Sequence, residues 1–192
     1  MALTDKLTAI ADAIRGKTGK TEEMTLAQMA TEIEGIETGG GGDNSIAWGI
    51  LDGSLTELEC AEITNLRDLA FQQHANITRV KFPNIVNITV SSLRSCPKLE
   101  LVDVGSKCLW IQANSMRDSS SLKTLILRRT DAPVSFVHTT GLQGTPFYTG
   151  GTGGTVYCPS ALIEQYQTAT NWSVLYTAGT CNFVALEGSE YE

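Results

Sequence analysis

Apolar residues recur at a fixed spacing through the middle of the chain. The pattern apolar-x-x-apolar-x-apolar occurs four times, at successive offsets of 22, 22 and 23, as Leu55-Leu58-Cys60, Ile77-Val80-Phe82, Leu99-Val102-Val104 and Leu122-Leu125-Leu127. The segment before each later copy repeats too, and each contains one large apolar residue: Phe71, Leu93 and Met116. A period of this length is typical of proteins in which each unit adds one short strand.

Within each copy, apolar and polar residues alternate, which predicts a strand with one buried face. Val102 and Val104 are expected to point inward, and the large residue of the preceding segment fills the same interior. We therefore predict an α+β fold: a leucine-rich-repeat solenoid of stacked short parallel strands. The polar residues of these strands are expected on a solvated outward face: Arg79, Lys81, Glu100, Asp103, Lys123 and Thr124.

Two helical stripes and a run of glycine precede the repeats. One stripe comprises Leu3, Leu7, Ile10 and Ile14, and the other comprises Leu26, Met29, Ile33 and Ile36. They predict an N-terminal helical hairpin within 1–38, which either packs on itself or on the second part, or serves as an attachment or oligomerisation segment. The glycines at 39–42 predict a flexible linker over 39–45 and favour oligomerisation. Residues 46–192 would form the solenoid.

The C-terminal part predicts a helix and a final strand. Pro159 is suited to begin a helix whose apolar side chains are Leu162, Ile163, Tyr166 and Ala169. Such a helix can cap the last open unit, with Trp172 at its edge. The run 183–186 resembles a strand, and the acidic residues after it are expected to fray.

Composition narrows the classes of partner. The 192 residues include 14 Lys and Arg against 21 Asp and Glu, a net charge of −7. This acidic balance argues against nucleic acid as a partner. The first residues lack the features of a secretory signal, and no run of about 18 apolar residues occurs. We therefore expect folding in a cytoplasm without membrane insertion.

Cysteine and histidine spacing gives little support for a metal site. The five cysteines form no CxxC pair, and His74 lies far from His138. Zinc sites usually need closely spaced ligands, so we predict buried free thiols ahead of a disulfide framework or metal ligation. The cysteines are Cys60, Cys96, Cys108, Cys158 and Cys181.

Glycine-rich segments and nucleophile signatures give equally little support for catalysis. GGTGG at 150–154 is not followed by Lys-Ser/Thr or by a helix, and GKTGKT at 16–21 lacks the first glycine of a phosphate loop. No GxSxG signature occurs, and the carboxylates occupy positions expected to be solvated. We predict a protein without catalytic residues, metal or cofactor.

The segment 128–155 breaks the repeat and mixes aromatic, histidine and glycine residues. Loops on a stiff scaffold often carry recognition residues. If a sugar or a protein receptor binds, the candidate residues are Trp110, His138 and Tyr148, because aromatic faces suit pyranose rings and anchor interfaces. The alternative, rated slightly ahead, is that Phe136, Phe147 and Tyr148 fill the core under a degenerate last unit.

Three parts of the sequence resemble known families. The repeat resembles BspA-like leucine-rich repeats, although it lacks the asparagine ladder of commoner leucine-rich repeats. Residues 7–36 are similar to the amino-terminal segment of tail and baseplate-associated proteins of phages and prophages of Gram-positive hosts. Residues 154–175 are similar to the closing segment of those proteins, with valine replaced by Cys158; the matching residues are Tyr157, Pro159, Leu162, Tyr166, Ala169 and Trp172.

These resemblances imply a non-enzymatic virion protein of a phage or prophage tail, as a tail tip, fibre or baseplate appendage. It would be assembled in the cytoplasm of the bacterial host and would mediate adhesion to the host surface. Its expected partners are other tail proteins, further copies of the chain, with a trimer possible, and a host-surface glycan or protein. The alternatives are a purely architectural tail subunit and a bacterial surface leucine-rich-repeat adhesin.

Overall fold

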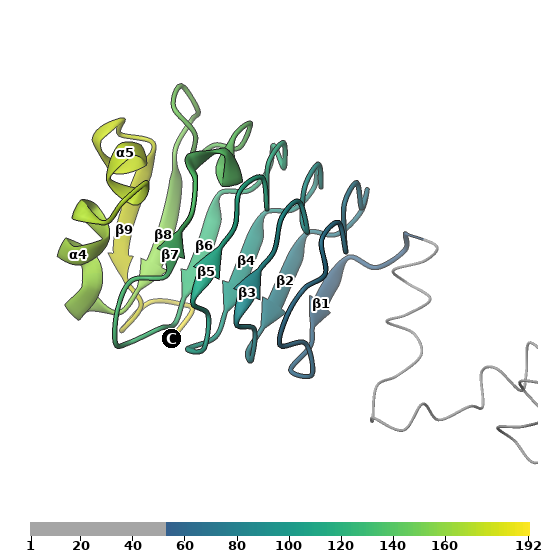
Figure 1. Cartoon of the computed structure of the whole chain (residues 1–192), viewed down its shortest axis with the longest axis horizontal. Coiled ribbons are helices and arrows are strands. Elements are labelled where there is room, and N and C mark those ends of the chain that lie inside the picture. The colour runs from purple at the N-terminus through teal and green to yellow at the C-terminus, as the bar shows by residue number, and fades with distance from the viewer. Residues whose placement is uncertain (1–52) are drawn as a thin grey trace, which may run out of the picture. The chain divides into compact units, whose positions relative to one another are not determined.

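A computed structural model describes residues 53–192 of the chain. The predicted helical hairpin of 1–38 and the linker of 39–45 lie outside the described residues. The described part is an α/β structure with a parallel sheet of six strands, in the order β1-β2-β4-β6-β8-β9 (Figure 1). Its strands are β1 (Glu57–Glu59), β2 (Arg79–Phe82), β4 (Leu101–Val104), β6 (Thr124–Leu127), β8 (Gly154–Cys158) and β9 (Cys181–Ala185).

The strand register follows the sequence period. Glu57 pairs with Arg79, Arg79 with Leu101, and Leu101 with Thr124, so each strand pairs with the equivalent strand of the next repeat. The prediction of stacked short parallel strands is therefore confirmed. The predicted α+β class is wrong, because the six-stranded sheet is wholly parallel and the structure is α/β. Parallel strands need crossover connections, and from β2 to β8 these connections contain the strands of a second sheet and little helix.

This second sheet has three parallel strands, β3 (Asn87–Ile88), β5 (Trp110–Ile111) and β7 (Ser135–Phe136). The chain alternates between the two sheets from β2 to β8. The sequence pattern did not predict the second sheet, since strands of two residues are too short to show an alternation.

The core contains the residues that the repeat placed inside. Val80, Phe82 and Val104 are fully buried, and Val102 is 1% exposed. The large residues of the preceding segments are buried as well: Phe71, Leu93 and Met116. The first copy is the exception, because Cys60 is partly exposed.

Asp103 lies on the outward face but, against the expectation for that face, it is not solvated. Only 4% of it is exposed, and Arg128 donates to both of its carboxylate oxygens. The interaction removes the need for water around the charge, so the carboxylate is tolerated in the sheet. The outward face carries exposed pairs as well, such as Lys81 with Glu59.

Short helices pack beside β9 at one end of the structure (Figure 1). The predicted helix begins with a 3₁₀ turn, Ser160–Leu162, and continues as α4 (Ile163–Thr168). It ends at Ala169, and a second helix, α5 (Trp172–Thr177), follows. A further 3₁₀ turn, η1, spans Thr139–Leu142.

An aromatic cluster holds these helices against the sheets. Trp172 lies 4.6 Å from Phe136, 5.8 Å from Tyr166 and 5.9 Å from Phe183, measured between ring centroids. Trp172 and Tyr166 are also hydrogen-bonded to the backbone of the same residue, Val134. Trp172 Nε1 donates to the oxygen of Val134, and Val134 N donates to the Tyr166 hydroxyl. Burial raises the pKa of Tyr166, so this hydroxyl stays neutral.

The acidic tail is not frayed as expected. Tyr191 packs edge to face against Tyr157 of β8 at 4.7 Å, and its backbone oxygen accepts a 2.6 Å hydrogen bond from Arg128 Nη2. An aromatic contact and a charge-assisted hydrogen bond are enough to order the segment.

The cysteines within 53–192 are free thiols, and four of them are buried as predicted: Cys96, Cys108, Cys158 and Cys181. Burial raises the pKa of Cys96 to about 11 and that of Cys108 to about 12. Because the thiolate is the reactive form, such groups are unreactive near neutral pH.

Candidate functional site

The outward face of the three-stranded sheet presents Trp110, 42% of which is exposed. The parallel register places Asn87 of β3 on one side of Trp110 and Ser135 of β7 on the other. Small polar neighbours leave the large aromatic side chain standing above the sheet. This combination makes the face the strongest candidate for a binding site.

Two open hollows meet at Trp110. The first lies toward the earlier repeats and is lined by Asp68, Asn87, Thr89, Val90, Trp110 and Gln112. The second lies between β7 and the turn that joins α4 to α5. Its lining combines Trp110 with Ser135, Val137 and Asn171.

Three polar groups of the first hollow have no hydrogen bond or ion pair with any residue of 53–192. They are the indole N–H of Trp110, the carboxylate of Asp68 and the side-chain amide of Gln112. By contrast, the indole of Trp172 donates to the oxygen of Val134 at 2.8 Å. Polar groups that converge beside an exposed aromatic ring are available to a ligand.

Two other side chains of this hollow donate hydrogen bonds to the preceding chain segment, while Asn87 Oδ1 is buried without a partner in 53–192. Asn87 Nδ2 donates to Asn65 Oδ1 at 2.8 Å, and Thr89 Oγ1 donates to the oxygen of Leu66 at 2.8 Å. The first bond joins two side chains and the second joins a side chain to the backbone, and together they tie the floor of the hollow to the preceding segment.

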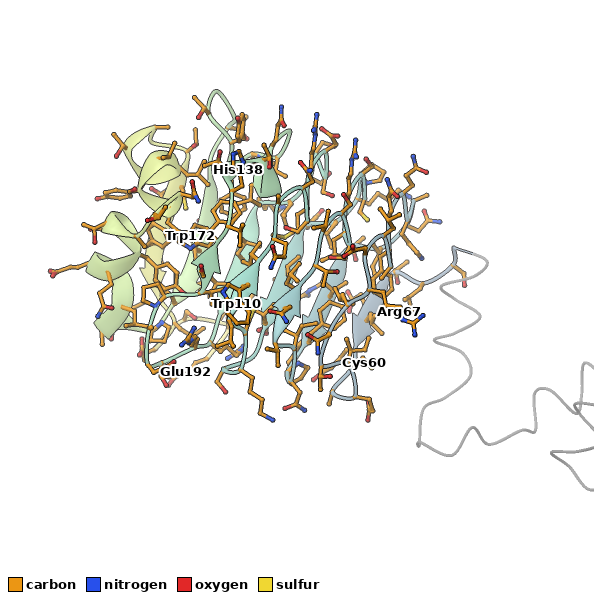
Figure 2. All side chains as sticks on the ribbon, viewed as in Figure 1. Cys60, Arg67, Trp110, His138, Trp172 and Glu192 are labelled. Carbon is orange, nitrogen blue, oxygen red and sulfur yellow. The ribbon has the colours of Figure 1, made fainter. Side chains whose placement is uncertain are left out.

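The three residues predicted from sequence do not form one site. Trp110 lies midway on the face, whereas His138 lies nearer the turns beyond β7 (Figure 2). The His138 imidazole caps η1, because Thr140 N donates to Nδ1 at 3.2 Å. Tyr148 is partly buried, and neither it nor His138 lines a hollow that contains Trp110.

Two aromatic residues of the segment 128–155 fill the interior, although most of the segment is exposed or half-buried. Phe147 is fully buried and Phe136 is 3% exposed, as the core-filling alternative required. Tyr148 differs from this expectation, because part of its side chain reaches solvent. Sequence reasoning missed Asp68 and Gln112, which belong to different repeats and meet only because the strands stack in register.

The outward face of the six-stranded sheet contains a second candidate surface. It is lined by paired charges, such as Lys81 with Glu59 and Arg128 with Asp103, and by the tail residues 190–192. Four of its charged side chains are already paired within the chain, whereas Glu57 and Arg79 form no ion pair with a residue of 53–192.

Residues 53–192 contain neither a candidate metal centre nor a candidate membrane span. No group of three or more His, Cys, Asp or Glu side chains in this part is placed to hold a metal ion. No helix of this part is long and apolar enough to cross a membrane.

The fold defines an α/β protein with parallel sheets and a solvent-facing aromatic surface. No protein-family model matches the chain, and no curated protein matches its sequence. The indication of function that the described residues supply is the geometry of the Trp110 face.

Proposed function

We propose that this chain is a non-enzymatic tail protein of a phage or prophage that attaches the particle to the host surface. The observation that carries this proposal is the Trp110 face, where an exposed indole and unpaired polar groups stand on a rigid parallel sheet. A display of this kind is suited to recognition, since the scaffold holds it in place before binding.

The scaffold is a leucine-rich-repeat solenoid in this proposal. Its support is the spacing of 22 or 23 residues between paired strands from β1 to β6, which also separates Asn87 from its partner Trp110 in the second sheet. Each unit buries its apolar side only against the next, so the ends need covers. Helix α4 with the buried Trp172 would serve as the C-terminal cap.

The assignment to a phage tail depends on the closing segment. Two of its matching aromatic residues, Tyr166 and Trp172, are fully buried and hydrogen-bonded to the same residue, Val134. The resemblance therefore includes residues that hold the end of the structure together. Several copies on one particle would convert weak binding by each Trp110 face into avidity.

A cell-binding assay tests the proposal. The full chain, fluorescently labelled, is incubated with a panel of Gram-positive bacteria and with their purified cell walls, and released sugars are measured in parallel. Saturable binding to some strains without release of sugars is the expected result. Absence of binding to every strain, or turnover of wall glycan, would overturn the adhesion proposal.

A purely architectural role is the second candidate, and it has an observation of its own. Large apolar side chains are exposed at the end that carries α5 and β9: Val174 at 52%, Tyr176 at 41% and Val184 at 41%. Exposed apolar clusters often mark protein interfaces. An architectural subunit would bind another tail protein through these residues and would show no affinity for cells.

A further inference from the structure

We propose that the hollow formed by Asp68, Val90, Trp110 and Gln112 is a binding site for an uncharged pyranose of a surface glycan. The inference rests on the proposed function, because adhesion supplies the reason for a glycan site. It goes beyond it by naming the hollow and the chemical class of the ligand.

Trp110 supplies the apolar side of the site. A pyranose ring has one or two faces of C–H groups, and these pack on an aromatic face that water otherwise covers. Val90, 39% exposed, lines the same hollow and extends this apolar surface. The width of one exposed indole suits a single sugar ring rather than a flat hydrophobic partner.

Asp68 and Gln112 supply hydrogen bonds for the hydroxyl groups. A carboxylate accepts from two neighbouring hydroxyls, and an amide both donates and accepts. Neither side chain, nor the Trp110 indole N–H, is engaged by another residue of 53–192. The hollow thus offers donors and acceptors at its rim, which a sugar can satisfy without breaking existing bonds.

The charge of the lining selects against anionic ligands. Asp68 is the one ionisable residue among those that line the hollow, and Arg67 beside it does not line it. A phosphate or carboxylate on the ligand would meet this negative charge in a chain of net charge −7. Neutral sugars are therefore favoured over phosphate-containing wall polymers.

The hollow on the other side of Trp110 is less suited to the same ligand. Its principal amide, Asn171 Nδ2, already donates to the backbone oxygens of Phe136 and Val137 at 2.8 and 3.0 Å. Its second indole, that of Trp172, is buried and bonded to Val134. Few of its polar groups remain for a sugar.

Nuclear magnetic resonance on the full chain tests the site. The indole N–H signal of Trp110, assigned from its loss in Trp110→Ala, is followed during titration with the methyl glycosides and short oligosaccharides of glucose, galactose, rhamnose and N-acetylglucosamine. At least one neutral sugar should shift this signal saturably. Poly(glycerol phosphate) serves as the anionic probe and should bind at least tenfold more weakly than that sugar.

Matched variants assign the residues. Trp110→Ala should abolish sugar binding, and Asp68→Asn should weaken it at least tenfold. Tyr176→Ala removes an aromatic residue of almost equal exposure (41%) on α5, and Glu164→Gln neutralises an exposed carboxylate on α4; both should bind as the wild type does. Folding of each variant is checked from its remaining amide signals.

The outcomes separate this inference from the proposed function. If no neutral sugar shifts the Trp110 signal, if the anionic polymer binds more tightly, or if Trp110→Ala retains affinity, the pyranose site is wrong. If the full chain binds cells in any of those cases, adhesion itself stands and uses another surface or ligand.

Discussion

Arg128 and Asp103 form a two-point ion pair on the outward face of the six-stranded sheet. Arg128 Nε donates to Oδ1 at 2.9 Å, and Nη2 donates to Oδ2 at 3.0 Å. The pair raises the pKa of Arg128, mainly through the hydrogen bonds from Arg128 to Asp103. The same Nη2 reaches the backbone oxygen of Tyr191, so one guanidinium connects β4 with the C-terminal segment.

Asp103→Asn is expected to destabilise the protein by about 1–3 kcal/mol. The change keeps the shape of the side chain, but it leaves Arg128 without its counter-charge beside a buried amide. Urea unfolding of the full chain measures the effect. Glu59→Gln is the control, since the exposed Lys81–Glu59 pair should contribute less than about 1 kcal/mol. Equal losses for the two variants would contradict the account.

Asp103 also shows what the hydrophobic pattern can predict. The alternation around Val102 and Val104 predicted strands, their inward residues and the register between repeats, because apolar burial repeats locally. It placed Asp103 in water, because its partner Arg128 belongs to a later part of the chain and is brought there only by stacking. The order of the tail at Tyr191 was missed for the same reason.

Gly105 lies where a side chain has no room. A Cβ at this position would overlap the backbone carbonyl of Pro83 in the neighbouring segment, and backbone cannot move aside cheaply. Gly105→Ala should therefore lower the free energy of unfolding by about 2–4 kcal/mol, because the two segments are forced apart. Thermal unfolding measures this loss.

Gly179→Ala provides the comparison for that prediction. Gly179 has φ of +73° and nothing within 4 Å of an added Cβ, so alanine there meets strain without a clash. Its expected cost is about 1 kcal/mol. A smaller loss for Gly105→Ala than for Gly179→Ala would show that the segments are less closely stacked than described.

Leu69 adopts a left-handed backbone conformation with φ of +65°, and its side chain is not held in the core, since 54% of the residue is exposed. Ser91 and Asn114 have the same kind of backbone one and two repeat periods later. Because asparagine tolerates this conformation better than leucine, Leu69→Asn should stabilise the protein by about 0.5–1 kcal/mol. Leu69→Ala is the control, because it keeps the backbone strain and should not raise the melting temperature. If Leu69→Ala raises the melting temperature as much as Leu69→Asn does, the effect comes from loss of the leucine side chain and not from relief of strain.

The buried thiols predict a loss of stability in alkaline solution. Burial raises the pKa of Cys108 and of Cys181 from 9.0 to about 12. Between these values the unfolded chain releases protons that the folded chain keeps, so the free energy of unfolding falls as pH rises above 9. Each thiol contributes a slope of about 1.4 kcal/mol per pH unit at most.

Urea unfolding between pH 8 and pH 10.5 measures this slope. Cys181→Ala removes one of the thiols and should make the decline above pH 9 shallower, whatever its effect on stability at pH 8. An unchanged slope would mean that Cys181 ionises alike in the folded and unfolded chain, contrary to its burial.

The candidate site was predictable from the sequence only in part. Trp110 could be selected because aromatic faces suit pyranose rings and anchor interfaces, whereas its polar neighbours Asn87 and Ser135 lie on other strands and show only in the structure. Asp68 and Gln112 belong to different repeats and carry no local signal, so only the register brings them together. His138 was selected for its chemistry, but its ring has the local role of capping η1.

Equilibrium binding of the full chain to purified walls of a responsive Gram-positive strain tests the central claim of adhesion most directly. Wild type and Trp110→Ala are titrated side by side, with Tyr176→Ala as the folded aromatic control. The account predicts saturable binding by wild type and by Tyr176→Ala, with at least a tenfold loss for Trp110→Ala. Walls that retain none of the three proteins, across every strain tried, would contradict it.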